Sequence, residues 1–200
     1  MSSTRLIVAL GAAGLLAGLA LVGVYALTLP TIQAEQARAL QEAIFQVLKG
    51  AEAIEAIEVE DETLPEDDRV AYAGRGTDGQ LIGYAIPAQG SGFMDTIKVL
   101  YGYDPETRTI IGFEVLDSRE TPGLGDRIKF DPVFLSNFEA LEVEAGIATA
   151  KPGEKNAGNQ IETISGATIS SKAVATMLDV STQRWMAAID RLRASEERDR

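Results

Sequence analysis

The chain has 200 residues, with 18 Lys and Arg against 30 Asp and Glu, so its formal net charge is -12. An acidic chain without a basic cluster does not fit nucleic-acid binding, because phosphate contact requires clustered Lys or Arg. The sequence has neither Cys nor His. This excludes thiol chemistry, Cys or His metal sites, and catalytic triads that depend on His. Carboxylate chemistry, hydroxyl chemistry or chemistry supplied by a cofactor remains.

A long uncharged run opens the chain, from Leu6 to Leu29. As a helix it would span about 36 Å, at about 1.5 Å per residue, and the hydrocarbon core of a bilayer is about 30 Å thick. A cleaved signal peptide is the alternative, but its apolar region is only about 7–15 residues long. The residues from Tyr25 to Pro30 also form a poor cleavage site. We therefore predict an uncleaved transmembrane anchor at residues 1–30.

The residues that flank the span predict its orientation. Arg5 precedes it, whereas Glu35 and Arg38 follow it, so the positive-inside rule favours a cytoplasmic N-terminus. Gly14 and Gly18 match a small-residue spacing that lets helices approach closely, although Gly and Ala are common in membrane spans generally.

Residues 31–68 are predicted to form a helix and an acidic connection. The helix is expected at Ile32–Lys49, followed by Gly50 as a stop signal. The acidic residues that follow are expected to be exposed, with one short strand. The apolar side of the predicted helix consists of Ile44, Val47 and Leu48.

Residues 69–200 are predicted to form one domain built on an antiparallel sheet. The turn sequences Thr77–Gln80 and Asp104–Thr107 join apolar or alternating segments, as expected of hairpins. The predicted strands are Val70–Gly74, Leu81–Pro87, Thr96–Tyr103 and Thr109–Leu116.

Helices are expected to flank this sheet. A short helix is predicted at Pro132–Phe138 and a long one at about Ser170–Ala194, because apolar residues recur there at helical spacing. The polar segment Thr149–Gln160 is predicted to be a loop. The fold class is therefore α+β: a single N-terminal transmembrane helix, then an antiparallel-sheet domain with flanking helices.

The stretch from Ser165 to Lys172 reads Ser-Gly-Ala-Thr-Ile-Ser-Ser-Lys and lies at the entry to the long predicted helix. A helix N-terminus presents unpaired N–H groups and the positive end of the helix dipole, which favour an anion such as phosphate. Gly166 and Ala167 allow close approach to the backbone, and Lys172 adds positive charge. The same residues also fit an ordinary N-cap, since Ser and Thr are preferred there.

Two glycine-containing segments lie earlier in the chain. Glu120–Asp126 reads Glu-Thr-Pro-Gly-Leu-Gly-Asp, in which Pro fixes the backbone and Gly permits tight turns, so backbone groups can approach a planar ligand. In Gly90–Met94, either Phe93 or Met94 can pack on an aromatic ring. A plain surface turn and a strand entry with core side chains are the respective alternatives.

Together, Ser-Gly-Ala-Thr at residues 165–168, followed by Ser-Ser, and Glu-Thr-Pro-Gly-Leu-Gly at residues 120–125 resemble a known family. It is the FMN-binding domain shared by the G subunit of the Rnf electron-transport complex and the C subunit of the sodium-pumping NADH:quinone reductase. The resemblance covers nearly the whole chain, and the short length favours the Rnf subunit. It implies covalent FMN, joined as a phosphoester to Thr168 by a flavin transferase that uses FAD and releases AMP.

The resemblance also implies which residues surround the flavin. Glu162, where the family usually has Asp, is expected to take part in recognition by the transferase. Relatives often have His shortly before the residue matching Glu120, whereas this chain has Ser118 and Arg119. Neither a catalytic side chain nor a metal is implied. The expected cofactor-binding residues are Ser165, Gly166, Ala167, Ser171, Lys172, Glu120, Thr121, Pro122, Gly123, Leu124, Gly92, Phe93 and Met94.

The function implied by the resemblance is electron relay in a membrane complex that couples ferredoxin/NAD electron transfer to Na+ or H+ translocation. The chain would be a redox subunit of this oxidoreductase and not catalytic alone. Expected partners are the other membrane subunits, the flavin transferase during maturation and membrane lipid. The expected location is the bacterial inner membrane, single-pass, with a periplasmic FMN-binding domain. The alternatives are the quinone-reductase C subunit and a membrane-anchored adaptor without flavin.

Overall fold

The computed structural model describes residues 3–59 and 69–198. Its first element, α1 (Ser3–Val47), is one continuous helix. The expected division at Pro30 is therefore wrong. Proline removes one intrahelical hydrogen bond, but the Ala, Leu, Gln and Glu residues around it favour helix. Just before Pro30, the Thr28 hydroxyl donates to the carbonyls of Val24 and Tyr25, at 3.0 and 3.2 Å.

The chain divides into two compact units, Met1–Gln41 and Glu42–Arg200. Within the part of the chain that the structure describes, α1 is the helix long and apolar enough to cross a membrane. Its large apolar side chains from Leu6 to Leu27 are exposed. Exposing so much apolar surface to water is unfavourable, at about 25 cal/mol per Å², so a bilayer is the environment that this composition fits.

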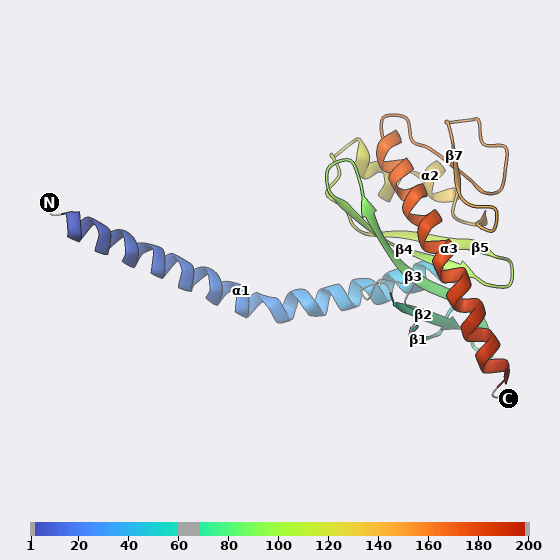
Figure 1. Ribbon diagram of the computed structural model, residues 1–200, viewed down its shortest axis with the longest axis horizontal. Coiled ribbons are helices and arrows are strands. Elements are labelled where there is room, and N and C mark those ends of the chain that lie inside the picture. The colour runs from blue at the N-terminus through green and yellow to red at the C-terminus, as the bar shows by residue number, and fades with distance from the viewer. Residues whose placement is uncertain (1–2, 60–68, 199–200) are drawn as a thin grey trace. The chain divides into compact units, whose positions relative to one another are not determined.

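The second unit contains a six-stranded sheet in which every neighbouring pair is antiparallel and the spatial order follows the chain order (Figure 1). The four strands predicted from turn and alternation signals are confirmed. The first strand lies where one short strand was expected in the acidic connection, whose residues 60–68 fall outside the described part. The strands are β1 (Ala53–Glu58), β2 (Val70–Arg75), β3 (Leu81–Ser91), β4 (Thr96–Asp104), β5 (Thr109–Asp117) and β6 (Leu141–Glu142).

The remaining elements follow β5. The predicted short helix is confirmed as α2, and the long helix begins two residues earlier than expected. The predicted loop Thr149–Gln160 is wrong at both ends, because short parallel strands form there without a local signal. The elements are η2 (Gly125–Lys129), α2 (Pro132–Ser136), β7 (Ala148–Ala150), β8 (Gln160–Glu162) and α3 (Thr168–Arg198).

One face of the sheet packs against α3, which is drawn in red in Figure 1. Val174, Trp185 and Ile189 of α3 are buried in a shared core with side chains of β2, β3 and β4. The Tyr101 hydroxyl of β4 lies 2.9 Å from the Ser181 hydroxyl of α3. This packing fixes α3 along the sheet, and so fixes the position of its N-terminal end.

The opposite face carries a row of glycines, one from each of four adjacent strands. The last turn of α1 packs on this glycine row, with Val47 and Leu48 buried. A Cβ atom at any of the four positions would come within 3 Å of the Val47 backbone, the Leu48 side chain or the backbone of β4. The glycine row consists of Gly74, Gly83, Gly102 and Gly112.

Candidate functional site

A cavity of 330 Å³ lies where three segments meet: the β3–β4 turn, the loop before η2, and the start of α3. Its volume falls within the range of small-molecule sites, about 300–1,000 Å³. The structure thus brings together residues far apart in the sequence. The predicted residues that line the cavity are Phe93, Glu120, Thr121, Leu124, Gly166, Ala167 and Thr168.

Glu120 joins the three segments. One carboxylate oxygen accepts the backbone N–H groups of Phe93 and Met94, at 2.9 and 3.0 Å. The other accepts the Ser170 hydroxyl of α3, at 2.5 Å. Gly125 is tightly packed here, because a Cβ atom there would lie within 3 Å of both Glu120 and Ser170.

The Glu120 carboxyl is buried, and burial by itself raises its pKa. The hydrogen bonds from Ser170 and from the backbone N–H groups of Met94 and Phe93 more than offset this effect, so the net pKa lies below its ordinary value of 4.5. Glu120 is therefore ionised at neutral pH and its bonds are made within the protein. Its observed role is to hold the walls of the cavity.

The start of α3 forms the polar end of the cavity. The Ala167 carbonyl accepts the Ser171 N–H at 2.9 Å, which makes Ala167 the N-cap and Thr168 the first helical residue. No residue in the described ranges 3–59 and 69–198 accepts a hydrogen bond from the backbone N–H of Thr168, Ile169 or Ser170. Three free donors at the positive end of a long helix suit an anion.

This geometry also decides between the two interpretations of the Ser165–Lys172 stretch. A capping hydroxyl accepts from an N–H two or three residues later, but the exposed Thr168 hydroxyl instead donates to the Ile164 carbonyl, at 3.4 Å. The N-cap position belongs to Ala167, which has no capping side chain. The interpretation as an ordinary Ser or Thr N-cap is therefore wrong.

The rest of the cavity wall is apolar. Phe93, Leu124 and Ile169 all line it, and each leaves more than half of its side chain exposed. Large apolar side chains that converge on a concave surface are typical of a ligand site. The cavity therefore pairs an anion-binding end with a surface suited to a flat aromatic ring.

Several predicted residues lie outside the cavity lining. Gly92, Met94, Pro122 and Gly123 belong to the turns that shape it. Ser171 is fully buried and bonds within the protein, accepting the Ile164 N–H at 3.1 Å and donating to the Ala167 carbonyl at 2.9 Å. Lys172 is exposed, one turn of α3 beyond Thr168.

Ser165 and Glu162 line a second cavity, of 210 Å³. Glu162 accepts the Gly153 N–H at 2.7 Å. Sequence reasoning missed Gly125, Ile169 and Ser170 as lining residues, although all three lie within or beside the two motifs. The hydroxyl of Ser170 meets a partner fifty residues away, so no local spacing identifies its role.

Comparison with known proteins agrees with this architecture. Residues 92–181 match the family model described as FMN-binding domain. The crystallised NqrC protein from Shewanella oneidensis superposes with a TM-score of 0.60 at 18% identity, over 78% of this chain and 99% of that one. This match defines the fold: a membrane-anchored FMN-binding domain of the α+β class, as predicted.

Two relatives narrow the family. The G subunit of an ion-translocating oxidoreductase complex from Methanosarcina acetivorans is 35% identical over 150 residues, which cover 75% of each chain. The G subunit of the Na+-translocating ferredoxin:NAD+ oxidoreductase complex from Acetobacterium woodii is 32% identical over 60% of this chain and 56% of its own length. The chain belongs to the G-subunit family of ion-translocating oxidoreductase complexes. The predicted recognition is confirmed.

Proposed function

We propose that the chain carries FMN covalently as a phosphoester on Thr168 and relays electrons within its complex. One observation carries this proposal: the exposed Thr168 hydroxyl stands at a helix start whose three N–H groups have no acceptor in the described residues, on the edge of an apolar cavity. The residues present fit a flavin phosphate at one end and an isoalloxazine ring against Phe93 and Leu124.

The attachment step is a phosphoryl transfer to the threonine. The Thr168 oxygen forms a bond to the flavin-side phosphorus of FAD, the P–O–P bond of FAD breaks, and AMP leaves with the proton that the hydroxyl gives up. The transferase supplies the catalysis, and Glu162, on the segment before Ser165, takes part in its recognition of the chain. An exposed hydroxyl on the first turn of a helix is accessible to such an enzyme.

After attachment, the phosphodiester keeps one negative charge. The free N–H groups and the dipole of α3 stabilise that charge, and Lys172 adds to the positive potential. FMN, when bound, supplies one- and two-electron redox chemistry. Glu120 holds the cavity walls in place, and the apolar side chains keep water from the ring. A chain without Cys or His can in this way serve as an electron carrier.

In the assembled complex, we propose electron transfer between ferredoxin and NAD coupled to movement of Na+ or H+, with those substrates bound by other subunits. Residues 1–30 anchor the chain in the bacterial inner membrane, with the N-terminus cytoplasmic. Residues 31–68 connect the anchor to the FMN-binding domain, residues 69–200, on the periplasmic side. The name of the Acetobacterium woodii relative supports the ferredoxin and NAD assignment.

Mass spectrometry of the full chain, produced with a flavin transferase, tests the cofactor. We expect an adduct of about 440 Da, the mass of FMN less one water, that maps to Thr168 and is lost in Thr168→Ala. Flavin fluorescence should survive on a denaturing gel only for the wild type. An unmodified wild-type chain would instead support the flavin-free adaptor.

The C subunit of a sodium-pumping NADH:quinone reductase is the second candidate, because the Shewanella oneidensis protein shares the fold. Both candidates carry the same cofactor, so the adduct does not separate them. Identification of the proteins that co-purify with the full chain does. Ferredoxin-linked subunits are expected, and quinone-reductase subunits would favour the second candidate.

A further inference from the structure

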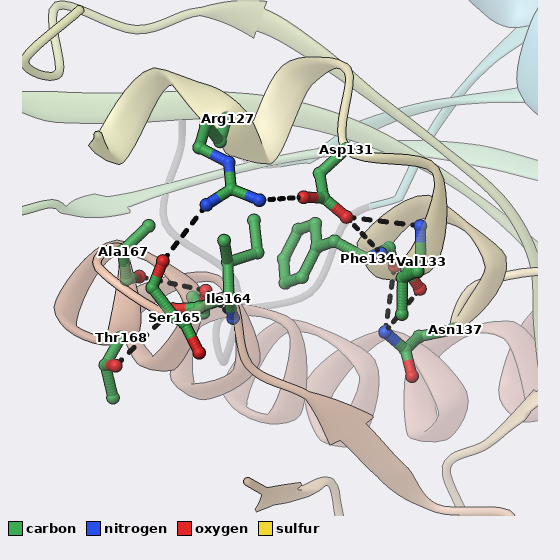
Figure 2. Close-up of polar contacts among 10 residues, drawn as sticks. Arg127, Asp131, Val133, Phe134, Asn137, Ile164, Ser165, Ala167 and Thr168 are labelled. Carbon is green, nitrogen blue, oxygen red and sulfur yellow. Dashed lines mark hydrogen bonds and ion pairs between the residues drawn. The ribbon is translucent and has the colours of Figure 1, made fainter. Parts of the chain in front are cut away.

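Two charged side chains outside the 330 Å³ cavity hold the segment that leads to Thr168. Arg127 of η2 donates from Nη1 to the Ser165 carbonyl at 3.0 Å, and from Nη2 to the Asp131 carboxylate at 2.5 Å. The other oxygen of Asp131 accepts two backbone N–H groups at the start of α2, at 3.2 Å each. Figure 2 shows this chain of contacts, which runs from the α2 cap through the guanidinium to the segment before α3.

The pair is more than a loose surface contact. The Asp131 side chain is only 13% exposed. Burial raises its pKa, but the Phe134 N–H and the Arg127 guanidinium more than offset this effect, so the net pKa lies below the ordinary value. A planar guanidinium can bond two partners at once in fixed directions. Arg127 is therefore held by Asp131 while it orients a carbonyl 38 residues along the chain.

The carbonyl that Arg127 holds sets the orientation of the next peptide unit. The described chain contains no cis peptide bond, so the Ser165 carbonyl and the Gly166 N–H point in opposite directions. Ser165 lines the 210 Å³ cavity together with Arg127, whereas Gly166 lines the 330 Å³ cavity together with Thr168. Holding the carbonyl on the Arg127 side thus turns the Gly166 N–H away from it, toward the side of Thr168.

Gly166 makes this arrangement depend on a contact from outside. Its φ is +86°, a region that glycine enters freely and that other residues disfavour. Glycine is equally free to leave that region, so the local sequence does not hold the peptide in one orientation. The hydrogen bond from Arg127 is the charged contact described on this peptide unit.

We propose that Arg127, locked by Asp131, is a positioning residue for covalent flavin attachment. It holds the Ser165–Gly166 peptide in the one orientation in which the transferase receives Thr168. This inference rests on the proposed flavinylation of Thr168.

The test measures the rate of attachment on the full chain in detergent, with FAD and a flavin transferase, by in-gel flavin fluorescence over time. Arg127→Met should lower kcat/KM for the chain about ten-fold, the factor expected for loss of a hydrogen bond from a charged donor. Arg127→Lys should recover part of the rate, because an ammonium reaches one partner without forming the fork. Arg119→Met is the matched control, since Arg119 pairs with Asp95 on the exposed surface, at 3.6 Å.

Asp131→Asn provides a second, independent variant. Its amide oxygen can still cap α2, but its amide nitrogen cannot accept from Arg127, so the rate should fall while the helix cap remains. A structural role alone would change the melting temperature or hydrogen exchange throughout the domain. Positioning predicts faster amide exchange confined to residues 164–168.

The outcomes separate this inference from the proposed function. If the wild-type chain gains no flavin, the proposed function fails and this inference with it. If the wild type is modified and a folded Arg127→Met or Asp131→Asn chain is modified at the same rate, only the positioning role is refuted. If Arg127→Met does not fold, the Asp131→Asn and Arg127→Lys rates decide.

Discussion

Replacing the buried carboxylate of Glu120 with an amide should destabilise the domain measurably at neutral pH. In Glu120→Gln, the amide oxygen can still accept the N–H groups of Phe93 and Met94, but these bonds lose their charge-assisted part. The other amide atom is a donor, so the 2.5 Å bond from the Ser170 hydroxyl is lost. Hydrogen bonds to charged groups contribute about 1.5–3 kcal/mol, against about 0.5–1.5 for neutral ones.

One lost bond and two weakened bonds exceed the gain from no longer burying a charge. We expect the free energy of unfolding to fall by about 2 kcal/mol at pH 7. Urea unfolding followed by tryptophan fluorescence measures it, because Trp185 is the only tryptophan in the chain and is buried. Glu139→Gln is the matched control, since it removes one charge from an exposed position.

The pH dependence gives a second criterion. The pKa of Glu120 is lower in the folded state than its ordinary value of 4.5. The ionised carboxylate therefore contributes stability that is fully present above that value and is lost as pH falls through the folded pKa. The difference between wild type and Glu120→Gln should be constant near neutral pH and should shrink below about pH 4.5. Equal unfolding free energies at pH 7, or a gap independent of pH, would refute the reasoning.

Three further predictions concern single positions. Gly166→Ala places a side chain at φ +86°, so it should cost about 1 kcal/mol in unfolding free energy and lower flavin loading on the gel; unchanged loading would contradict it. Gly112→Ala puts a Cβ within 3 Å of the Val47 backbone, so it should cost about 1–3 kcal/mol, with Gly79→Ala in an exposed turn as the comparison for space alone; equal urea midpoints would show that the contact is tolerated. Lys172→Ala should reduce flavin loading without a change in melting temperature, and full loading would show that Lys172 is incidental.

Much of the sheet could be predicted because its signals are local. β2, β3, β4 and β5 each begin at the residue expected from apolar alternation and turn sequences. The helix pattern also identified Val174, Trp185 and Ile189 as core residues. It failed at Val180, which is 44% exposed, because spacing marks a helix face without showing where the sheet beneath it ends.

The site was predictable only in part, for a different physical reason. The two motifs marked the segments that meet at the cavity, yet their contacts depend on tertiary structure. Glu120 was expected beside the cofactor, and the structure shows its carboxylate bonded to three protein donors. Arg127 gave no sequence signal at all, since its partner Ser165 is brought to it by the packing of η2 against α3.

The glycine row determines which fragments of this protein can be made as soluble domains. Because four strands present bare backbone to the last turn of α1, that turn fills a groove that no side chain of the sheet can fill. A fragment beginning at Glu42 keeps this plug and matches the compact unit. A fragment beginning after Leu48 would leave the apolar groove open to water and prone to self-association. The membrane helix therefore ends as a structural part of the domain it carries.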